Sequence, residues 1–223
     1  MTKIAAIIPA YNEEMTIAQV VRPLYASPFI QEVTVVSDGS TDATSRTARE
    51  AGATVFELPH RGGKGEAMLY GLARTDAPIV VFFDADLIGL TPDHVERLVR
   101  PVLRGERTMN VGLRDRGRLL MSIMRRLPLI SGERALLRTV MEEVDPRFLR
   151  GYMVEIALNE HCRARGLSYG AVELPGLHIR RKDQKVGVPR AVLQYFCMFY
   201  QVAKALLVVK VALRNLKPLE SHS

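Results

Sequence analysis

Four strand-like apolar runs, each ending in polar or charged residues, constrain the fold of this chain most strongly. They are KIAAIIPAY at 3–11, EVTVVSD at 32–38, TVFELP at 54–59 and PIVVFFDAD at 78–86. Segments with helical apolar spacing separate them. Runs that do not alternate between apolar and polar residues, joined by helices, predict an α/β fold with a mainly parallel sheet covered by helices on both faces.

Helix boundaries can be assigned between these runs. Asn12 and the two following glutamates are expected to cap a first helix, and Gly52 to end a second helix over 42–52. A third helix is expected over 66–75. Thr91, followed by proline, is typical of the start of a helix that continues to about Leu103, and TMNVGL at 108–113 predicts a further strand.

The composition predicts one substantial core. A chain of 223 residues with 48% hydrophobic content can fold as a single domain, which we place at 1–186, followed by an apolar helical extension at 187–223. Two cysteines are too few for a disulfide framework or a zinc-ligand pattern, which favours a reducing, cytoplasmic location. The first residues lack the long apolar region of a secretion signal. The net charge of +7 fits a partner that carries phosphates.

Asp84 and Asp86 come after an unbroken run of five apolar residues at 79–83, with one residue between them. On a strand, residues i and i+2 point to the same side, so both carboxylates should face one point. Like charges that close raise each other's pKa unless a cation lies between them. Mg²⁺ or Mn²⁺ would remove the conflict, because such ions use one or two carboxylates together with substrate phosphates. The alternative is a pair of helix caps or solvated loop residues.

Two other segments add to this pattern. SDGST at 37–41 ends a strand, where Asp38 could meet a base or a ribose, or could form an ordinary turn. GGKGEA at 62–67 brings glycines and Lys64 to the start of a helix, where backbone N–H groups and a cation can bind phosphate oxygens. Neither the Walker spacing nor the dinucleotide G-x-G-x-x-G spacing is present. The sequence therefore predicts a nucleotide site of another kind.

The order of the motifs resembles a known family. IIPAYNEE at 7–14, VVSDGSTDAT at 35–44, GGKGEAMLYGL at 62–72 and VVFFDADL at 80–87 resemble the nucleotide-sugar half of family 2-type glycosyltransferases with the GT-A fold. The segments 127–140, 150–174 and 178–187 resemble the glucosyl phosphoglycerate synthase branch and, more loosely, dolichyl-phosphate mannosyltransferases. This resemblance covers roughly residues 3–190 and implies a metal-dependent transfer of a sugar from a nucleotide-diphosphate-sugar donor to a phosphate-bearing acceptor.

The resemblance also implies roles for individual residues. Asp86 and His178 would bind Mg²⁺ or Mn²⁺; the alternative for His178 is a surface histidine in a basic loop. Asp84 would approach the ribose or the sugar, and Glu155 would lie near the donor sugar. The residues expected to line the nucleotide and donor are Pro9, Ala10, Tyr11, Glu13, Asp38, Lys64, Asp84 and Ala85.

In such a site the metal ion and Lys64 are expected to stabilise the negative charge that develops on the leaving diphosphate. A hydroxyl acceptor attacking with inversion would need a general base, for which Glu133 in SGERAL is the candidate, whereas a phosphate acceptor would need none. Glu133 could instead hold an acceptor loop. Inversion and retention, like the donor base and sugar, stay open at this point.

The acceptor is constrained by two basic segments, 114–126 and 178–185, which could bind an acceptor phosphate or form a solvated face. Both phosphoglycerate and a polyprenyl phosphate fit the first description.

The apolar helix expected at 188–216 is too interrupted by polar residues to span a membrane. It could pack against the domain, form a homodimer, or lie peripherally on a membrane surface that carries a lipid acceptor.

Two other classes of protein were weighed. A sugar nucleotidyltransferase should carry a glycine-rich loop after the first strand, which AIIPAYNEE lacks. A non-catalytic module that binds membranes or nucleic acid would exploit the basic surface but has no need of converging acids. We therefore expect a glycosyltransferase without a nucleic-acid partner.

Overall fold

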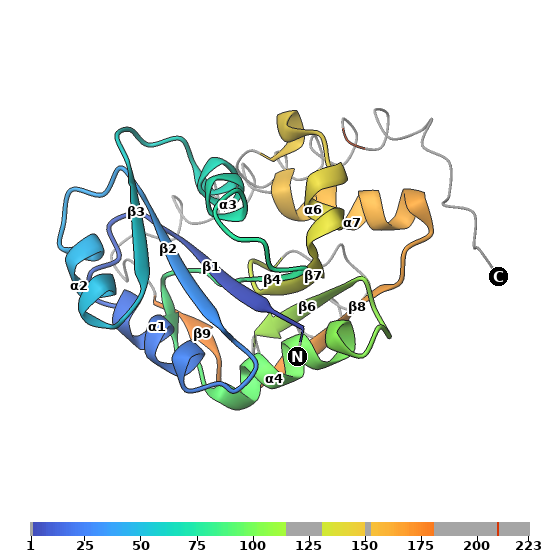
Figure 1. The fold of residues 1–223 in the computed structure, drawn as a ribbon, viewed down its shortest axis with the longest axis horizontal. Coiled ribbons are helices and arrows are strands. Elements are labelled where there is room, and N and C mark those ends of the chain that lie inside the picture. Colours follow the sequence, from blue (N-terminus) through green and yellow to red (C-terminus); the bar gives the residue numbers. More distant parts are fainter. Residues whose placement is uncertain (1, 115–130, 150–152, 181–208, 210–223) are drawn as a thin grey trace, which may run out of the picture.

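The computed structural model describes residues 2–114, 131–149, 153–180 and 209 (Figure 1). Seven strands form one sheet in the spatial order β3-β2-β1-β4-β7-β6-β8. Their bounds are β1 (Ile4–Ala10), β2 (Glu32–Asp38), β3 (Thr54–Leu58), β4 (Ile79–Phe82), β6 (Met109–Arg114), β7 (Arg134–Leu137) and β8 (Tyr169–Leu174). All neighbours pair in parallel except β7, which is antiparallel to β4 and β6. The predicted mainly parallel α/β sheet is confirmed.

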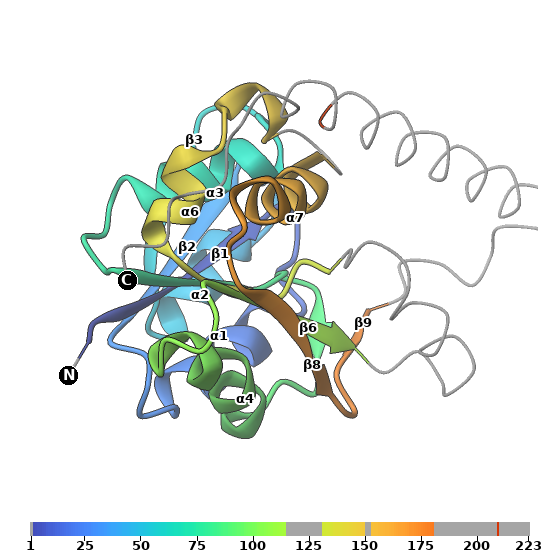
Figure 2. The same cartoon turned by 90° about the vertical axis from the view of Figure 1, so that its right-hand side faces the viewer.

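Helices cover both faces of the sheet (Figure 2). They are α1 (Ile17–Tyr25), α2 (Thr44–Glu50), α3 (Lys64–Leu72), α4 (Pro92–Leu103), α6 (Arg138–Glu143) and α7 (Met153–Arg165), with a 3-10 turn, η1, at Pro146–Phe148. Successive residues of a strand point to opposite faces, so Ile8 packs with α1 and α4 whereas Ile7 packs with α3, α6 and α7. Apolar clusters therefore lie on both faces of the sheet, each between the strands and one layer of helices.

A second, two-stranded sheet lies beside the main one. Its strands are β5 (Leu87–Ile88) and β9 (His178–Ile179), which pair antiparallel with Ile88 opposite His178. The backbone N–H of Arg180 donates to the carbonyl oxygen of Asp86 over 2.8 Å. This pairing ties the segment that follows Asp86 to residues ninety or more positions later in the chain.

Two local predictions were wrong. Asn12 does not cap the first helix, which begins at Ile17 after Thr16; Asn12 adopts a positive φ of 53° and its side chain accepts a hydrogen bond from the N–H of Thr41. The strand that was expected to contain both aspartates ends at Phe82. Strand alternation therefore does not orient Asp84 and Asp86.

The fourth helix was predicted correctly. Thr91 is its N-cap in a capping box with His94, Pro92 is its first residue, and it ends at Leu103. The helical extension expected at 187–223 falls outside the described residues, apart from Val209. Within the residues that the structure describes, no helix is long and apolar enough to cross a membrane.

Candidate active site

A pocket of about 320 Å³ opens where β1, β2 and β4 end. Ligands of open α/β sheets bind at this edge, in the crevice outside the carboxyl ends of the strands, where loop side chains are not packed against the sheet. All of the residues predicted to line the nucleotide and donor lie in its wall, together with Asp86. The lining residues are Pro9, Ala10, Tyr11, Glu13, Asp38, Arg61, Gly63, Lys64, Asp84, Ala85 and Asp86.

Asp38 holds the loop that precedes α3. Its two carboxylate oxygens accept hydrogen bonds from the N–H groups of Gly62 and Gly63, over 2.7 and 2.8 Å. The adjacent Gly39 has a φ of +68°, and a Cβ there would lie 2.9 Å from the backbone nitrogen of Arg61. The backbone groups that we expected to meet phosphate are thus bonded to Asp38, and any contact of Asp38 with a base would share one of these oxygens.

Arg61 is a pocket residue that the sequence analysis missed. Its guanidinium lies over the ring of Tyr11, 4.1 Å from the ring centroid. Both residues line the pocket. A solvent-exposed arginine in a loop carries no periodic signal, so nothing in the sequence indicated this contact.

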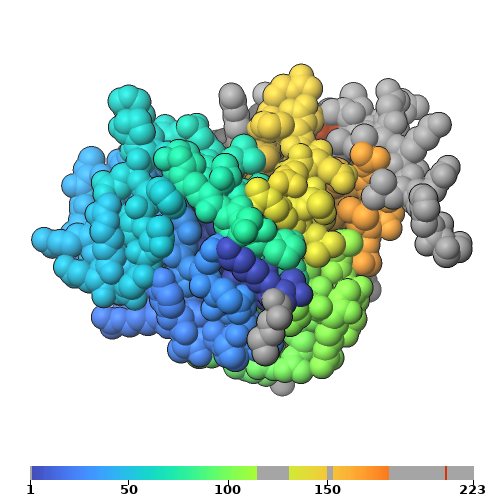
Figure 3. Space-filling view, viewed as in Figure 1, coloured from blue at the N-terminus to red at the C-terminus, as the bar shows by residue number. Residues whose placement is uncertain are grey.

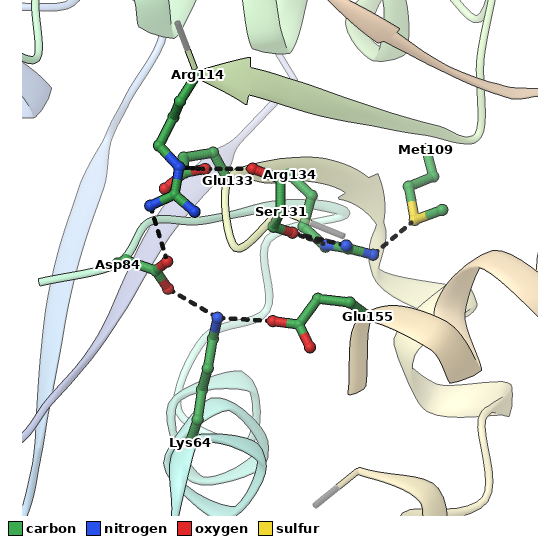
Figure 4. A network of polar contacts seen from close by, with 8 residues as sticks. All are labelled: Lys64, Asp84, Met109, Arg114, Ser131, Glu133, Arg134 and Glu155. Atoms are coloured by element: carbon green, nitrogen blue, oxygen red, sulfur yellow. Dashed lines mark hydrogen bonds and ion pairs between the residues drawn. The ribbon is translucent and has the colours of Figure 1, made fainter. Parts of the chain in front are cut away.

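Lys64, at the start of α3, lies between two carboxylates (Figure 4). Its Nζ is 2.7 Å from Oδ1 of Asp84 and 2.9 Å from Oε1 of Glu155. Burial alone would lower the pKa of Lys64, but the two carboxylates outweigh it and raise the pKa above its ordinary value. Burial likewise opposes ionisation of Asp84, yet Lys64 and Arg114 hold the pKa of that carboxyl below its ordinary range. The structure thus joins α3, the end of β4 and the first turn of α7 through charged side chains.

Glu133 lies behind this triad rather than in the pocket wall. It is fully buried; its Oε2 accepts a hydrogen bond from Ser131 Oγ over 2.5 Å and lies 3.4 Å from Nε of Arg114. Burial first, and then the charge of Asp84, raise the pKa of Glu133. The neighbouring Arg134 is also buried, and its guanidinium donates to the carbonyl oxygen of Ser131. These contacts fix the turn at Ser131–Glu133.

Gly132 allows Asp84 to occupy its position. A Cβ on Gly132 would overlap with both carboxylate oxygens of Asp84 and lie 2.5 Å from its Cγ. Gly65 is equally constrained, because a Cβ there would overlap with the carbonyl oxygen of Leu149. Figure 3 shows the green-blue surface of α3 next to the yellow surface of the segment that contains α6. The missing side chains of Gly65 and Gly132 therefore let α3 approach the backbone at Leu149 and let the Asp84 carboxylate approach the turn at Ser131–Glu133.

The metal ligands proposed from the resemblance lie on adjoining segments. Asp86 lines the pocket, and His178 stands on β9, which pairs with the strand that follows Asp86. His178 is exposed, and its Nδ1 lies 3.0 Å from the carbonyl oxygen of Gly176. No group of three His, Cys, Asp or Glu side chains that could hold a metal occurs among the described residues. A site built from these two ligands would need oxygen atoms from a substrate.

The sheet order and the pocket at the carboxyl ends of its strands define a GT-A fold. A family model, Glycosyl transferase family 2, matches residues 5–153, and the chain belongs to this family of glycosyltransferases. The predicted resemblance is confirmed.

Particular relatives narrow the comparison. The chain is 42% identical over 112 residues to the glucosyl-3-phosphoglycerate synthase of Mycobacterium tuberculosis. The aligned segment covers 46% of this chain and 35% of that enzyme. The chain is 36% identical over 107 residues to 4,4'-diaponeurosporenoate glycosyltransferase of Staphylococcus aureus, 45% of this chain and 28% of that protein. The matched segment thus spans about a third of the length of these curated relatives.

Solved structures agree over a longer stretch. The crystal structure of the M. tuberculosis synthase with Mn²⁺, UDP and glucosyl-3-phosphoglycerate has a TM-score of 0.76 and 31% identity, covering 93% of this chain and 80% of that one. The structure of the same enzyme with Mg²⁺ and UDP has the same TM-score and identity. The similarity therefore includes the half of the domain that follows the nucleotide motifs.

Proposed function

We propose that this chain transfers a hexose from a uridine-diphosphate sugar, UDP-glucose first among them, to a phosphate-bearing acceptor of the phosphoglycerate kind. The observation that carries the proposal is the single pocket that gathers Lys64, Asp84 and Asp86 with the residues predicted to line a nucleotide. Similarity to a synthase crystallised with Mn²⁺, UDP-glucose and phosphoglyceric acid supports the choice of donor and acceptor.

The charges of the pocket wall suit a divalent cation. Four acids, Glu13, Asp38, Asp84 and Asp86, line it, against two bases, Arg61 and Lys64. A nucleoside diphosphate would meet a net negative wall unless a cation came with it. Mg²⁺ and Mn²⁺ fit this donor set, because such ions are commonly held by one or two protein ligands and substrate phosphates. Asp86 and His178 would hold the ion, which when bound stabilises the charge that develops on the leaving diphosphate.

The side chains of this chain would divide the remaining work. Lys64 would neutralise diphosphate oxygens, and Glu155, whose Oε1 pairs with Lys64 and whose buried Oε2 has no hydrogen-bond partner among the described residues, would lie near the donor sugar. Glu133 has no exposed surface and is paired with Arg114, so it cannot reach an acceptor hydroxyl in this arrangement. We assign Glu133 the task of holding the turn that follows the 115–130 segment rather than that of a general base.

A donor screen tests the proposal. UDP-glucose, GDP-mannose and other nucleotide sugars would be scanned for thermal stabilisation with Mn²⁺, with Mg²⁺ and with EDTA. We expect a shift with a uridine donor that needs the metal ion and is lost in Asp86→Ala. Asp93→Ala on α4, far from the pocket wall, is the matched control and should keep the shift. A protein that no donor stabilises in the presence of either metal ion would refute the proposal.

A second assay tests the acceptor. Transfer from the donor found in the screen would be measured with 3-phosphoglycerate and with a short polyprenyl phosphate. Transfer to 3-phosphoglycerate is expected. Transfer to the polyprenyl phosphate alone would move the proposal to a lipid acceptor, and flotation with anionic liposomes would then test whether residues 188–216 bind a membrane surface, as one of our sequence hypotheses has it.

A further inference from the structure

Arg114, the last residue of β6, joins the site to the buried carboxylate behind it. Its side chain is only 9% exposed, and its Nε lies 3.4 Å from Oε2 of Glu133. Its Nη1 points toward Asp84 but stays 3.8 Å from Oδ2, too far for a hydrogen bond. This Nη1 is buried and has no hydrogen-bond partner among the residues that the structure describes. The guanidinium of Arg114 is thus paired with Glu133 through Nε, whereas its Nη1 only approaches Asp84 (Figure 4).

Asp84 stands between two cations. One oxygen, Oδ1, bonds to Lys64 over 2.7 Å, while the other, Oδ2, faces Arg114. Gly132 leaves room for the carboxylate but none for a further side chain. A shift of about 1 Å toward Arg114 would bring Oδ2 within hydrogen-bond distance of Nη1. The same shift would lengthen the bond from Lys64.

Lys64 is fully neutralised in this state, because Asp84 and Glu155 both pair with it. A lysine that is to neutralise a diphosphate must give up at least part of this pairing. A buried Asp84 carboxylate that lost its pairing with Lys64 would destabilise the protein unless another cation paired with it. Arg114 is placed to do so, because its unpartnered Nη1 already points at the oxygen in question.

We propose that Arg114 is a positioning residue that takes over Asp84 when a nucleoside diphosphate binds, and so releases Lys64 to pair with the diphosphate. The inference rests on the proposed function and adds a residue that neither touches the ligand nor binds the metal ion. Glu133 has a defined part in it, since it fixes the Nε side of the guanidinium while Nη1 changes partner. The sequence analysis placed Arg114 in a basic segment that could bind an acceptor phosphate or form a solvated face, and the proposal gives this arginine a different role.

The test compares nucleotides with and without the second phosphate. Affinities for UDP and UMP would be measured by calorimetry with Mn²⁺ for the wild type, Arg114→Met and Arg114→Lys. We expect Arg114→Met to weaken UDP binding about tenfold and UMP binding less than about twofold, with Arg114→Lys in between. Arg107→Met is the matched control: Arg107 contacts Asn110 and Ala171 near the start of the same strand and should leave both affinities unchanged.

A double-mutant cycle gives the deciding result. In a Lys64→Met background, Arg114→Met should cost no further UDP affinity, because there is no lysine left to release. A full tenfold loss in that background, or an equal loss for UDP and UMP, would overturn the inference, and so would an unchanged UDP affinity in a folded Arg114→Met protein. Failure of the wild type to bind UDP would instead overturn the proposed function and the inference with it.

Discussion

Gly132→Ala probes the geometry of Asp84 without touching a charged side chain. The new Cβ would lie 2.5 Å from Cγ of Asp84, whereas ordinary contacts begin at 3.4 Å, so the carboxylate must retreat by about 1 Å. Gly132 is not among the residues with a positive φ, and alanine can therefore adopt its backbone conformation. The retreat would stretch the 2.7 Å bond between Asp84 and Lys64.

The cost of this substitution can be worked from the displacement. Misplacing a group at a reacting centre by about 1 Å can lower turnover roughly 100-fold. Overpacking a buried site costs about 1–2 kcal/mol of the free energy of unfolding, which for a chain of this size is a melting temperature lower by a few degrees. We expect a folded protein with little transferase activity, measured by mass spectrometry of the glycosylated product and by circular dichroism melting.

The control removes the atoms that clash. In an Asp84→Ala background, Gly132→Ala should no longer lower the melting temperature, because the Cβ then has room. Wild-type turnover and stability in Gly132→Ala would refute the geometry of the site. Equal destabilisation with and without the Asp84 carboxylate would show that the new methyl group clashes elsewhere.

Four further outcomes are expected. Glu133→Gln removes the charge that holds Nε of Arg114, so sugar transfer and UDP affinity should both fall, and equal transfer rates in mutant and wild type would contradict a role for Glu133. Burial raises the pKa of Glu133 above its ordinary 4.5, so the protonated carboxyl stabilises the folded wild type most below pH 4.5. This stabilisation is lost as the pH rises through the folded pKa. The stability of Glu133→Gln relative to wild type should therefore improve from pH 4 to 7 in urea titrations. Gly65→Ala should destabilise the fold by about 3 kcal/mol, because its Cβ meets the backbone oxygen of Leu149 rather than a side chain that can turn away; a mutant that melts like wild type would contradict this. Burial raises the pKa of the Cys162 thiol to about 12, so in a Cys197→Ser protein iodoacetamide at pH 8 should label it only after unfolding, and rapid native labelling would count against its burial.

The sheet and the pocket could be predicted from the sequence because both follow from short-range patterns. Apolar runs without alternation indicate strands buried on both faces, and the carboxyl ends of parallel strands meet at one edge. The residues that end β1, β2 and β4 therefore had to lie near one another, and Tyr11, Asp38 and Asp84 do line one pocket.

The charged network could not be predicted in the same way. Lys64 and Glu155 are separated by 91 positions, and their contact depends on how α7 packs against α3. The strand β7 is four residues long and antiparallel to its neighbours, so no periodicity marked it. Because Glu133 immediately precedes this strand, its burial behind Arg114 followed from a strand that the sequence did not reveal.

The contrast between the whole chain and its pocket bears on how the donor is bound. The chain carries a net charge of +7, which attracts phosphates from a distance, whereas acids outnumber bases by four to two in the pocket wall. The bases that do lie there are restrained, since Lys64 is paired with two carboxylates and Arg61 is stacked on Tyr11. A nucleotide sugar would thus be drawn to the surface by general charge but held only when a divalent ion offsets the acids and Lys64 is released. We expect such a site to discriminate against phosphates that arrive without a metal ion, and the comparison of Mn²⁺ with EDTA measures this behaviour.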